Sequence, residues 1–251
     1  MRRQNGRVNP LRTKITSTAL AVGAVLVAVS GCTEAGTAAS NDNAPLPTIG
    51  LGGDLSGAET IPGGLQAEAA DVESIVMIGD SITEGSIEAL NNRYAAAGYD
   101  DVLIEAQRGK RMATSDGDNP SGVKVADFIT GGDDDHEGEL WVVALGTNDI
   151  NQYSSPDELA GVVDEMLDAV PDEVPLVWVD TYYDDQLEGA AFVNTVVADR
   201  LARRGNAVMA RWSDVASGDG VLSQDGVHPT DDGQLAFADV VVSEVDEFLG
   251  R

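Results

Sequence analysis

Short apolar segments recur along most of the chain at a nearly constant spacing. The gaps between their starts measure 28, 38, 35 and 32 residues, which is the length of one β-α-β unit. The segments are continuously apolar rather than alternating, as is typical of strands covered on both faces. The predicted strands are Ser74–Ile78, Val102–Ala106, Leu140–Leu145, Pro175–Val179 and Ala207–Ala210.

Helical patterns occupy the gaps between these segments. The clearest has apolar residues on one stripe and begins at Ser155, with Pro156 in the first turn and Glu158 as the acid of a capping box. Two further patterns cover residues 187–201 and 231–249. Strands that alternate with helices predict a three-layer α/β sandwich with a mostly parallel sheet. Ligand sites in such sheets lie at the carboxyl ends of the strands.

The chain before the first strand has a different character. Residues 1–14 hold five bases and no acid, and Ile15–Val29 is an uncharged, mostly apolar run of 15 residues. A membrane-spanning helix needs about 20 such residues, so the run is typical of a signal-peptide core. It ends in Val-Ser-Gly-Cys32, which resembles the bacterial lipobox, whose cysteine takes a diacylglycerol and becomes the new N-terminus. The resemblance predicts a lipoprotein signal peptide over residues 1–31.

Two alternatives to this interpretation are an ordinary cleavage site with a chance cysteine and twin-arginine export through Arg2 and Arg3. Lipidation is favoured because the only cysteine of the sequence stands at the lipobox position, whereas the residues expected around a twin-arginine pair are absent. Residues 32–70 are rich in small residues and proline and have no sustained period, which predicts a flexible tether. The remaining residues, 71–251, form the predicted domain, exported and lipid-anchored to the outer face of a bacterial membrane.

Charge narrows the range of partners. The chain has 43 acids against 15 bases, a net charge of −28, and five of the bases precede Cys32, so the rest carries 10 bases and a net charge of −33. A body this negative repels phosphate backbones, which excludes nucleic acid as a partner. A single cysteine also excludes an internal disulfide.

Neither a metal nor another cofactor is expected. The acidic run 133–137 is the only candidate for a metal site in the sequence, and we interpret it as a solvated loop. A calcium loop at Asp116-x-Asp118-Asn119 is rejected, because the residues that follow do not supply the ligand and the turn glycine that such a loop requires.

Three polar motifs follow predicted strands or precede a helix. The first is Gly-Asp-Ser81 after the first strand, where the serine hydroxyl would project from a sharp turn toward the positive end of a helix. The alternative is that Ser81 forms a capping box with Glu84. The second is Gly-Thr-Asn148-Asp after the third strand, where the amide could donate to an oxyanion or satisfy a local turn.

The third motif is Asp225-Gly-Val-His228-Pro, directly before the last predicted helix. A histidine that acts as a base needs a group to fix its tautomer, and an aspartate three residues earlier on a turn can reach its Nδ1. The alternative is a structural histidine.

In this order the three motifs resemble those of the SGNH (GDSL) hydrolase family, and the similarity covers residues 71–249, including Gly233. The resemblance implies a flavodoxin-like five-stranded sheet with Ser81 as nucleophile and His228 as general base, oriented by Asp225. It also implies an oxyanion hole made by the Ser81 N–H, a glycine N–H and the Asn148 side chain.

For that glycine the best candidate is Gly109, which follows the second predicted strand. The Ala-x-x-Gly-Lys stretch around it and Trp212 resemble the extracytoplasmic domains associated with cell-envelope O-acyl transfer.

The sequence therefore predicts a monomeric serine esterase that removes small acyl groups from esters of envelope or extracellular glycans. The alternatives are an O-acyltransferase of the same fold and a non-catalytic envelope- or carbohydrate-binding module. A binding module has no need of all four residues Ser81, Asp225, His228 and Asn148, so the catalytic interpretation is favoured.

The lipobox generates the first testable prediction. When the producing cells are extracted with detergent and the phases are separated, the Cys32→Ser variant should no longer partition into the detergent phase, because the substitution removes the attachment point of the acyl chains. Esterase activity should be unchanged, since the tether separates Cys32 from the domain. A variant that still partitions like the wild type, or a wild type found entirely in the culture fluid, contradicts lipidation.

Overall fold

The computed structural model describes residues 72–131 and 138–251. The predicted signal peptide, Cys32, the tether and the acidic run 133–137 therefore lie outside the described residues. Within the described part no helix is long and apolar enough to cross a membrane.

The described residues form one five-stranded sheet with the order β2-β1-β3-β4-β5, and every neighbouring pair is parallel. The predicted α/β fold with a flavodoxin-like strand order is confirmed. The strands are β1 (Ser74–Gly79), β2 (Asp101–Ala106), β3 (Leu140–Ala144), β4 (Leu176–Val179) and β5 (Ala207–Ala210). The chain steps outward from β1 to β2 and then crosses to β3, so the loops after β1 and β3 lie side by side.

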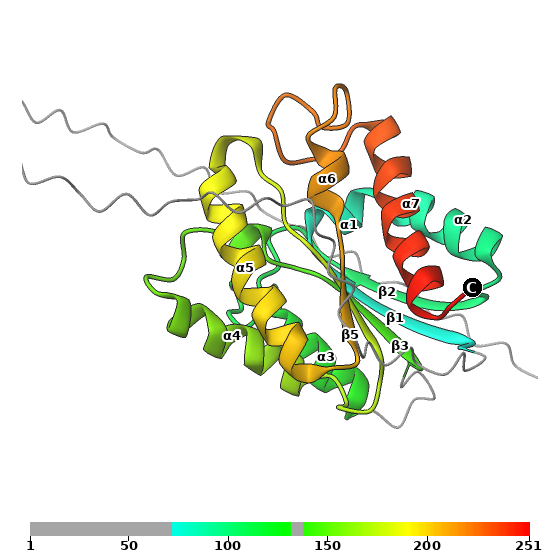
Figure 1. The fold of residues 1–251 in the computed structure, drawn as a ribbon, viewed down its shortest axis with the longest axis horizontal. Coiled ribbons are helices and arrows are strands. Elements are labelled where there is room, and N and C mark those ends of the chain that lie inside the picture. Colours follow the sequence, from blue (N-terminus) through cyan, green and yellow to red (C-terminus); the bar gives the residue numbers. More distant parts are fainter. Residues whose placement is uncertain (1–71, 132–137) are drawn as a thin grey trace, which may run out of the picture. The chain divides into compact units, whose positions relative to one another are not determined.

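Helices cover both faces of the sheet (Figure 1). On one face lie α1 (Ser81–Gly85), α2 (Ile87–Ala97), α6 (Trp212–Ala216) and α7 (Asp231–Phe248). On the other lie α3 (Gly122–Thr130), α4 (Pro156–Asp168) and α5 (Leu187–Arg204). Two short 3-10 helices, η1 (Thr147–Asp149) and η2 (Asp184–Gln186), follow β3 and β4.

Each face of the sheet has its own apolar core. In β1, Ile75 and Met77 pack toward α2 and α7, whereas Val76 and Ile78 pack toward α3 and α4. Successive residues of a strand point to opposite faces, and both faces are covered here, so all four of these positions are apolar. This explains the continuous apolar segments of the sequence.

The predicted helix starts are close to those observed. Ser155 caps α4 by accepting a hydrogen bond from the Glu158 N–H at 3.2 Å, with Pro156 at the first helical position. The Glu158 carboxylate, however, accepts from the N–H and hydroxyl of Ser154 rather than from the N–H of Ser155. The expected capping box is therefore displaced by one residue.

The loop between α6 and α7, orange in Figure 1, is held against the start of α7. The Thr230 N–H donates to the Val221 carbonyl at 2.9 Å, and the Thr230 hydroxyl accepts from the Gly233 N–H at 3.1 Å. A Cβ on Gly233 would lie 2.0 Å from the Val221 oxygen. Because this distance is far inside van der Waals contact, only glycine lets the loop approach α7 so closely.

A pair of helical glycines tests this packing. Gly233→Ala should destabilise the protein by about 1–3 kcal/mol through overpacking. Gly161→Ala, in α4, should instead stabilise it by about 0.5–1 kcal/mol, because nothing lies within 4 Å of the added Cβ. Urea unfolding measures both, and equal effects of the two substitutions would contradict the close approach of the loop.

Candidate active site

Ser81 is the first residue of α1 and directly follows the turn that ends β1. The N-cap of α1 is Asp80, whose Oδ1 accepts a hydrogen bond from the Ile82 N–H at 2.9 Å. The alternative in which Ser81 caps the helix is therefore wrong, because the cap lies one residue earlier. The Ser81 hydroxyl is left to point away from the helix, and its N–H has no acceptor among the described residues.

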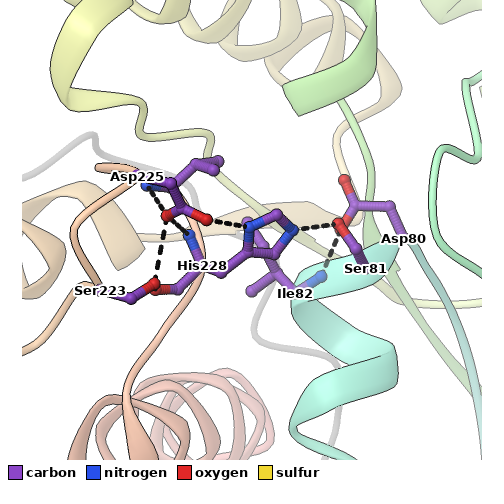
Figure 2. A network of polar contacts seen from close by, with 7 residues as sticks. Asp80, Ser81, Ile82, Ser223, Asp225 and His228 are labelled. Carbon is purple, nitrogen blue, oxygen red and sulfur yellow. Dashed lines mark hydrogen bonds and ion pairs between the residues drawn. The ribbon is translucent and has the colours of Figure 1, made fainter.

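His228 lies between Ser81 and Asp225 (Figure 2). Its Nε2 is 2.9 Å from the Ser81 Oγ, and its Nδ1 is 2.7 Å from Oδ2 of Asp225. The loop before α7 thus brings a histidine and a carboxylate to a serine 147 residues away in sequence. This is the geometry in which a base accepts a proton from a hydroxyl while a carboxylate holds the opposite ring nitrogen.

The Asp225 carboxylate is fixed by several donors. Its Oδ1 accepts from the N–H groups of His228 and Val227 at 3.0 and 3.1 Å, and from the Ser223 hydroxyl at 3.1 Å. These hydrogen bonds, the His228 N–H first, lower the pKa of Asp225 well below its usual range. Asp225 is therefore an anion at neutral pH, as a group that stabilises an imidazolium must be.

The loop after β2 brings Gly109 to the same site. Gly109 has φ +75°, which glycine adopts without strain, and its N–H also has no acceptor among the described residues. The loop is held in place by a hydrogen bond from the Asn119 side chain to the Arg108 carbonyl at 2.9 Å. Two unpaired backbone donors, on Ser81 and Gly109, therefore line one pocket.

Asn148, in η1 after β3, brings a side-chain amide to the same pocket, and this amide already has two acceptors in the protein. Its Nδ2 lies 3.2 Å from Oδ2 of Asp80 and 3.1 Å from the Lys110 carbonyl. Both partners are distant in sequence, so the Asn148 side chain does not serve only a local turn.

A pocket of about 460 Å³ opens above these groups. An exposed ion pair between Arg108 Nε and Glu84 Oε2, 3.0 Å apart, stands at its wall. The remaining lining residues are Ser81, Gly85, Gly109, Asn148 and His228. None of the described residues in this lining has an aliphatic side chain, and the His228 imidazole is the only ring among them.

Buried charges lie behind the pocket. Burial raises the pKa of Asp80 to about 6, and it does the same for Asp149. The Asp149 carboxylate accepts from the Met112 N–H at 3.2 Å and from the Tyr153 hydroxyl at 3.2 Å. Burial also lowers the pKa of Lys110, whose Nζ donates to the Pro120 carbonyl at 3.1 Å.

Comparison with known proteins agrees with this geometry. The sequence model of the GDSL-like lipase/acylhydrolase family matches residues 77–236, more than half of the chain. The chain belongs to this family. It is thus a carboxylic ester hydrolase of the SGNH/GDSL type. No curated protein matches the sequence.

Several solved structures share the fold of this GDSL-like protein. An aryl esterase from M. smegmatis is 16% identical, with a TM-score of 0.55 over 70% of this chain and 99% of its own. Est24, a carbohydrate acetylesterase from Sinorhizobium meliloti, is 14% identical, with a TM-score of 0.54 and the same coverage. The catalytic domain of the peptidoglycan O-acetyltransferase OatA from Streptococcus pneumoniae is 17% identical, with a TM-score of 0.53 over 70% and 94%.

The structure adds residues that the sequence analysis did not assign to the site. Asp80 contacts Asn148, the Lys110 carbonyl accepts from the same amide, and Ser223 contacts Asp225. A signal existed only for Asp80, because aspartate is as good an N-cap as serine and stands one position earlier. Trp212 packs edge-to-face against Phe237, with ring centroids 5.2 Å apart, and lies in the core rather than in the pocket lining.

The raised pKa of Asp149 gives a pH-dependent prediction. The pKa of Asp149 is about 4 in the unfolded chain and about 6 in the folded protein. Between these two pH values the folded state binds more protons than the unfolded state, so the free energy of unfolding falls as the pH rises. Asp149→Asn removes this penalty and keeps an acceptor for Met112. The variant should be more stable than wild type by about 1–3 kcal/mol at pH 8 and nearly equal at pH 4.

Urea unfolding of both proteins at the two pH values measures the difference, and the comparison cancels the contribution of every other titrating group. A gap between variant and wild type that is the same at pH 4 and pH 8 would show that the Asp149 carboxylate is not penalised by burial.

Proposed function

We propose that this protein is an extracytoplasmic serine esterase that hydrolyses small acyl esters of envelope or extracellular glycans through an acyl-Ser81 intermediate. The observation that carries the proposal is the unbroken hydrogen-bonded series Ser81, His228 and Asp225 at the wall of an open pocket. In this proposal Ser81 is the nucleophile, His228 the general base and Asp225 the group that orients it.

The first step is attack of the Ser81 Oγ on the ester carbonyl carbon. His228 Nε2, 2.9 Å away, takes the hydroxyl proton as the C–O bond forms, and Asp225 stabilises the resulting imidazolium through Nδ1. The tetrahedral intermediate then collapses, and His228 gives the proton to the departing alcohol. Water attacks the acyl-Ser81 by the same route in reverse, which releases the acid and restores the serine.

The negative charge of the tetrahedral intermediate needs donors placed in advance. The Ser81 and Gly109 N–H groups have no other acceptor in the described structure, and the Asn148 amide lines the same pocket. One such donor typically contributes about 10²–10³ in rate. The machinery is complete without a cofactor, because acyl transfer through serine requires no metal or redox group.

The pocket favours a small acyl group and a polar alcohol. Each methylene that enters an apolar pocket gains about 0.8 kcal/mol, but the described lining offers glycines, an amide, a histidine and the Arg108–Glu84 ion pair instead. Sugar hydroxyls can accept from Arg108 and donate to Glu84. The net charge of −33 beyond residue 31 also opposes anionic lipid head groups.

Hydrolysis is favoured over transfer to a second alcohol by the exposure of the site. The His228 side chain is 47% exposed, so water reaches the acyl-serine unless a bound acceptor displaces it. A non-catalytic binding module would have no use for a histidine whose two ring nitrogens contact a serine and a carboxylate. The monomeric state and the lipid anchor at Cys32 are parts of the proposal that rest on the sequence alone.

A series of nitrophenyl esters tests both the chemistry and the substrate class. For the purified protein, kcat/KM should be highest from acetyl to butyryl and should fall by the octanoyl ester. Ser81→Ala should reduce the rate to near background and abolish labelling by a fluorophosphonate probe. The variant should stay folded, because Asp80 and not Ser81 caps α1.

Ser154→Ala is the matched control, since this serine lies outside the pocket lining and, among the described residues, hydrogen-bonds only to Glu158. It should be labelled and active like the wild type. Full labelling of the Ser81→Ala variant would exclude Ser81 as nucleophile, whereas a rate that still rises at the dodecanoyl ester would exclude small acyl groups as the preferred substrates.

A further inference from the structure

We infer that Asp80 is a positioning residue that holds the Asn148 amide in the oxyanion hole and fixes it relative to Ser81. The inference rests on the proposed function, in which Asn148 donates to the oxyanion. Asp80 itself does not line the pocket and is 1% exposed, so it acts through its neighbours.

The two oxygens of Asp80 serve two different elements. Oδ1 accepts from the Ile82 N–H at 2.9 Å, which fixes the first turn of the helix that begins with Ser81. Oδ2 accepts from Asn148 Nδ2 at 3.2 Å, in the 3-10 helix that follows β3. One buried carboxylate therefore fixes the position of the nucleophile relative to the amide.

The amide has one other partner in the described structure. Asn148 Nδ2 also donates to the Lys110 carbonyl at 3.1 Å, in the loop that carries Gly109. Asp80 and Lys110 are both buried, and Asn148 lines the pocket. Because the amide nitrogen carries two hydrogens, the one that donates to the Lys110 carbonyl in the free protein turns to the oxyanion in this proposal, while the other stays on Asp80. Without Asp80 the amide is held on one side only, and its terminal torsion, which is broad in free asparagine, is no longer fixed.

Asparagine in place of Asp80 isolates this contact. The substituted side chain has the same shape but one acceptor oxygen instead of two, so it cannot serve both Ile82 and Asn148. A misplaced donor costs rate rather than binding, and a displacement of about 1 Å can cost about 10²-fold. We expect Asp80→Asn to lower kcat for the acetyl ester about 10–100-fold, with KM changed less than about 3-fold.

A double-mutant cycle separates this role from others that Asp80 could have. Asn148→Ala should lower kcat/KM by about 10²–10³ through loss of one oxyanion donor. If Asp80 acts through Asn148, adding Asp80→Asn to that variant should change kcat/KM less than about 3-fold. Equal losses in both backgrounds would overturn the inference and would show that Asp80 acts directly, for example through its charge on His228.

Two further variants serve as controls for the double-mutant cycle. Asp80→Ser preserves an N-cap acceptor for Ile82 but cannot reach Asn148, and it replaces Asp80→Asn in the cycle if the latter does not fold. Ser155→Ala removes the comparable cap of α4 and should lower the melting temperature without changing kcat. Loss of activity in Ser155→Ala as well would mean that any lost helix cap is sufficient, which overturns the inference.

Failure of the proposed function gives a different pattern. Wild-type protein that neither hydrolyses the esters nor reacts with the fluorophosphonate probe would contradict the esterase itself. An active, labelled wild type with additive Asp80 and Asn148 effects, or with no effect of Asn148→Ala, would leave the esterase standing and contradict only the positioning role.

Discussion

Two hydrogen bonds of the Asp80 carboxylate connect the ends of β1 and β3, where the direction of the chain across the sheet reverses. From β1 the chain steps outward to β2, and it then crosses back to β3 on the other side of β1. The loops after β1 and β3 therefore diverge to opposite faces and leave a crevice between them, as in other parallel sheets of this order. The Asp80 bond to Asn148 spans that crevice, and its bond to the Ile82 N–H fixes the carboxylate on the β1 side.

This arrangement has an energetic cost that the rest of the fold must offset. Burial raises the pKa values of Asp80 and Asp149 to about 6 and lowers that of Lys110. An ionised carboxylate that is penalised in this way destabilises the folded state at neutral pH. The two apolar cores, one with the buried side chains Trp141 and Trp178 and the other with Trp212, supply the compensating stability. Perturbed groups of this kind concentrate at functional sites, and here they lie directly behind the pocket.

The sequence was sufficient to predict the sheet, because the inner strands β1, β3 and β4 are buried on both faces and thus almost continuously apolar. The predicted starts and ends of the strands agree with the structure within one residue; β3, for example, ends at Ala144 and not at Leu145. The sequence also predicted the places of the site residues, with Ser81 and Asn148 after strands and His228 before the last helix.

The contacts behind the pocket could not be predicted in the same way. The hydrogen bonds of Asp80 and Lys110 to Asn148 join residues 68 and 38 positions apart, and no local pattern records such a pairing. The alternative in which Ser81 caps α1 was wrong for a related reason. Asp80 and Ser81 are equally good caps, and only the tertiary position of the turn decides between them.

The two halves of the site depend on different parts of the fold. Ser81, Gly109 and Asn148 follow neighbouring parallel strands, so the sheet itself fixes the donors and the nucleophile. His228 and Asp225 belong instead to the loop before α7, whose approach depends on Gly233 and the Thr230 cap. Loosening this loop would remove the base and leave the oxyanion donors in place. Because an oxyanion hole and binding alone retain about 10³–10⁴ of rate over water in serine hydrolases, a protein with a displaced loop would be a weak esterase rather than an inert one.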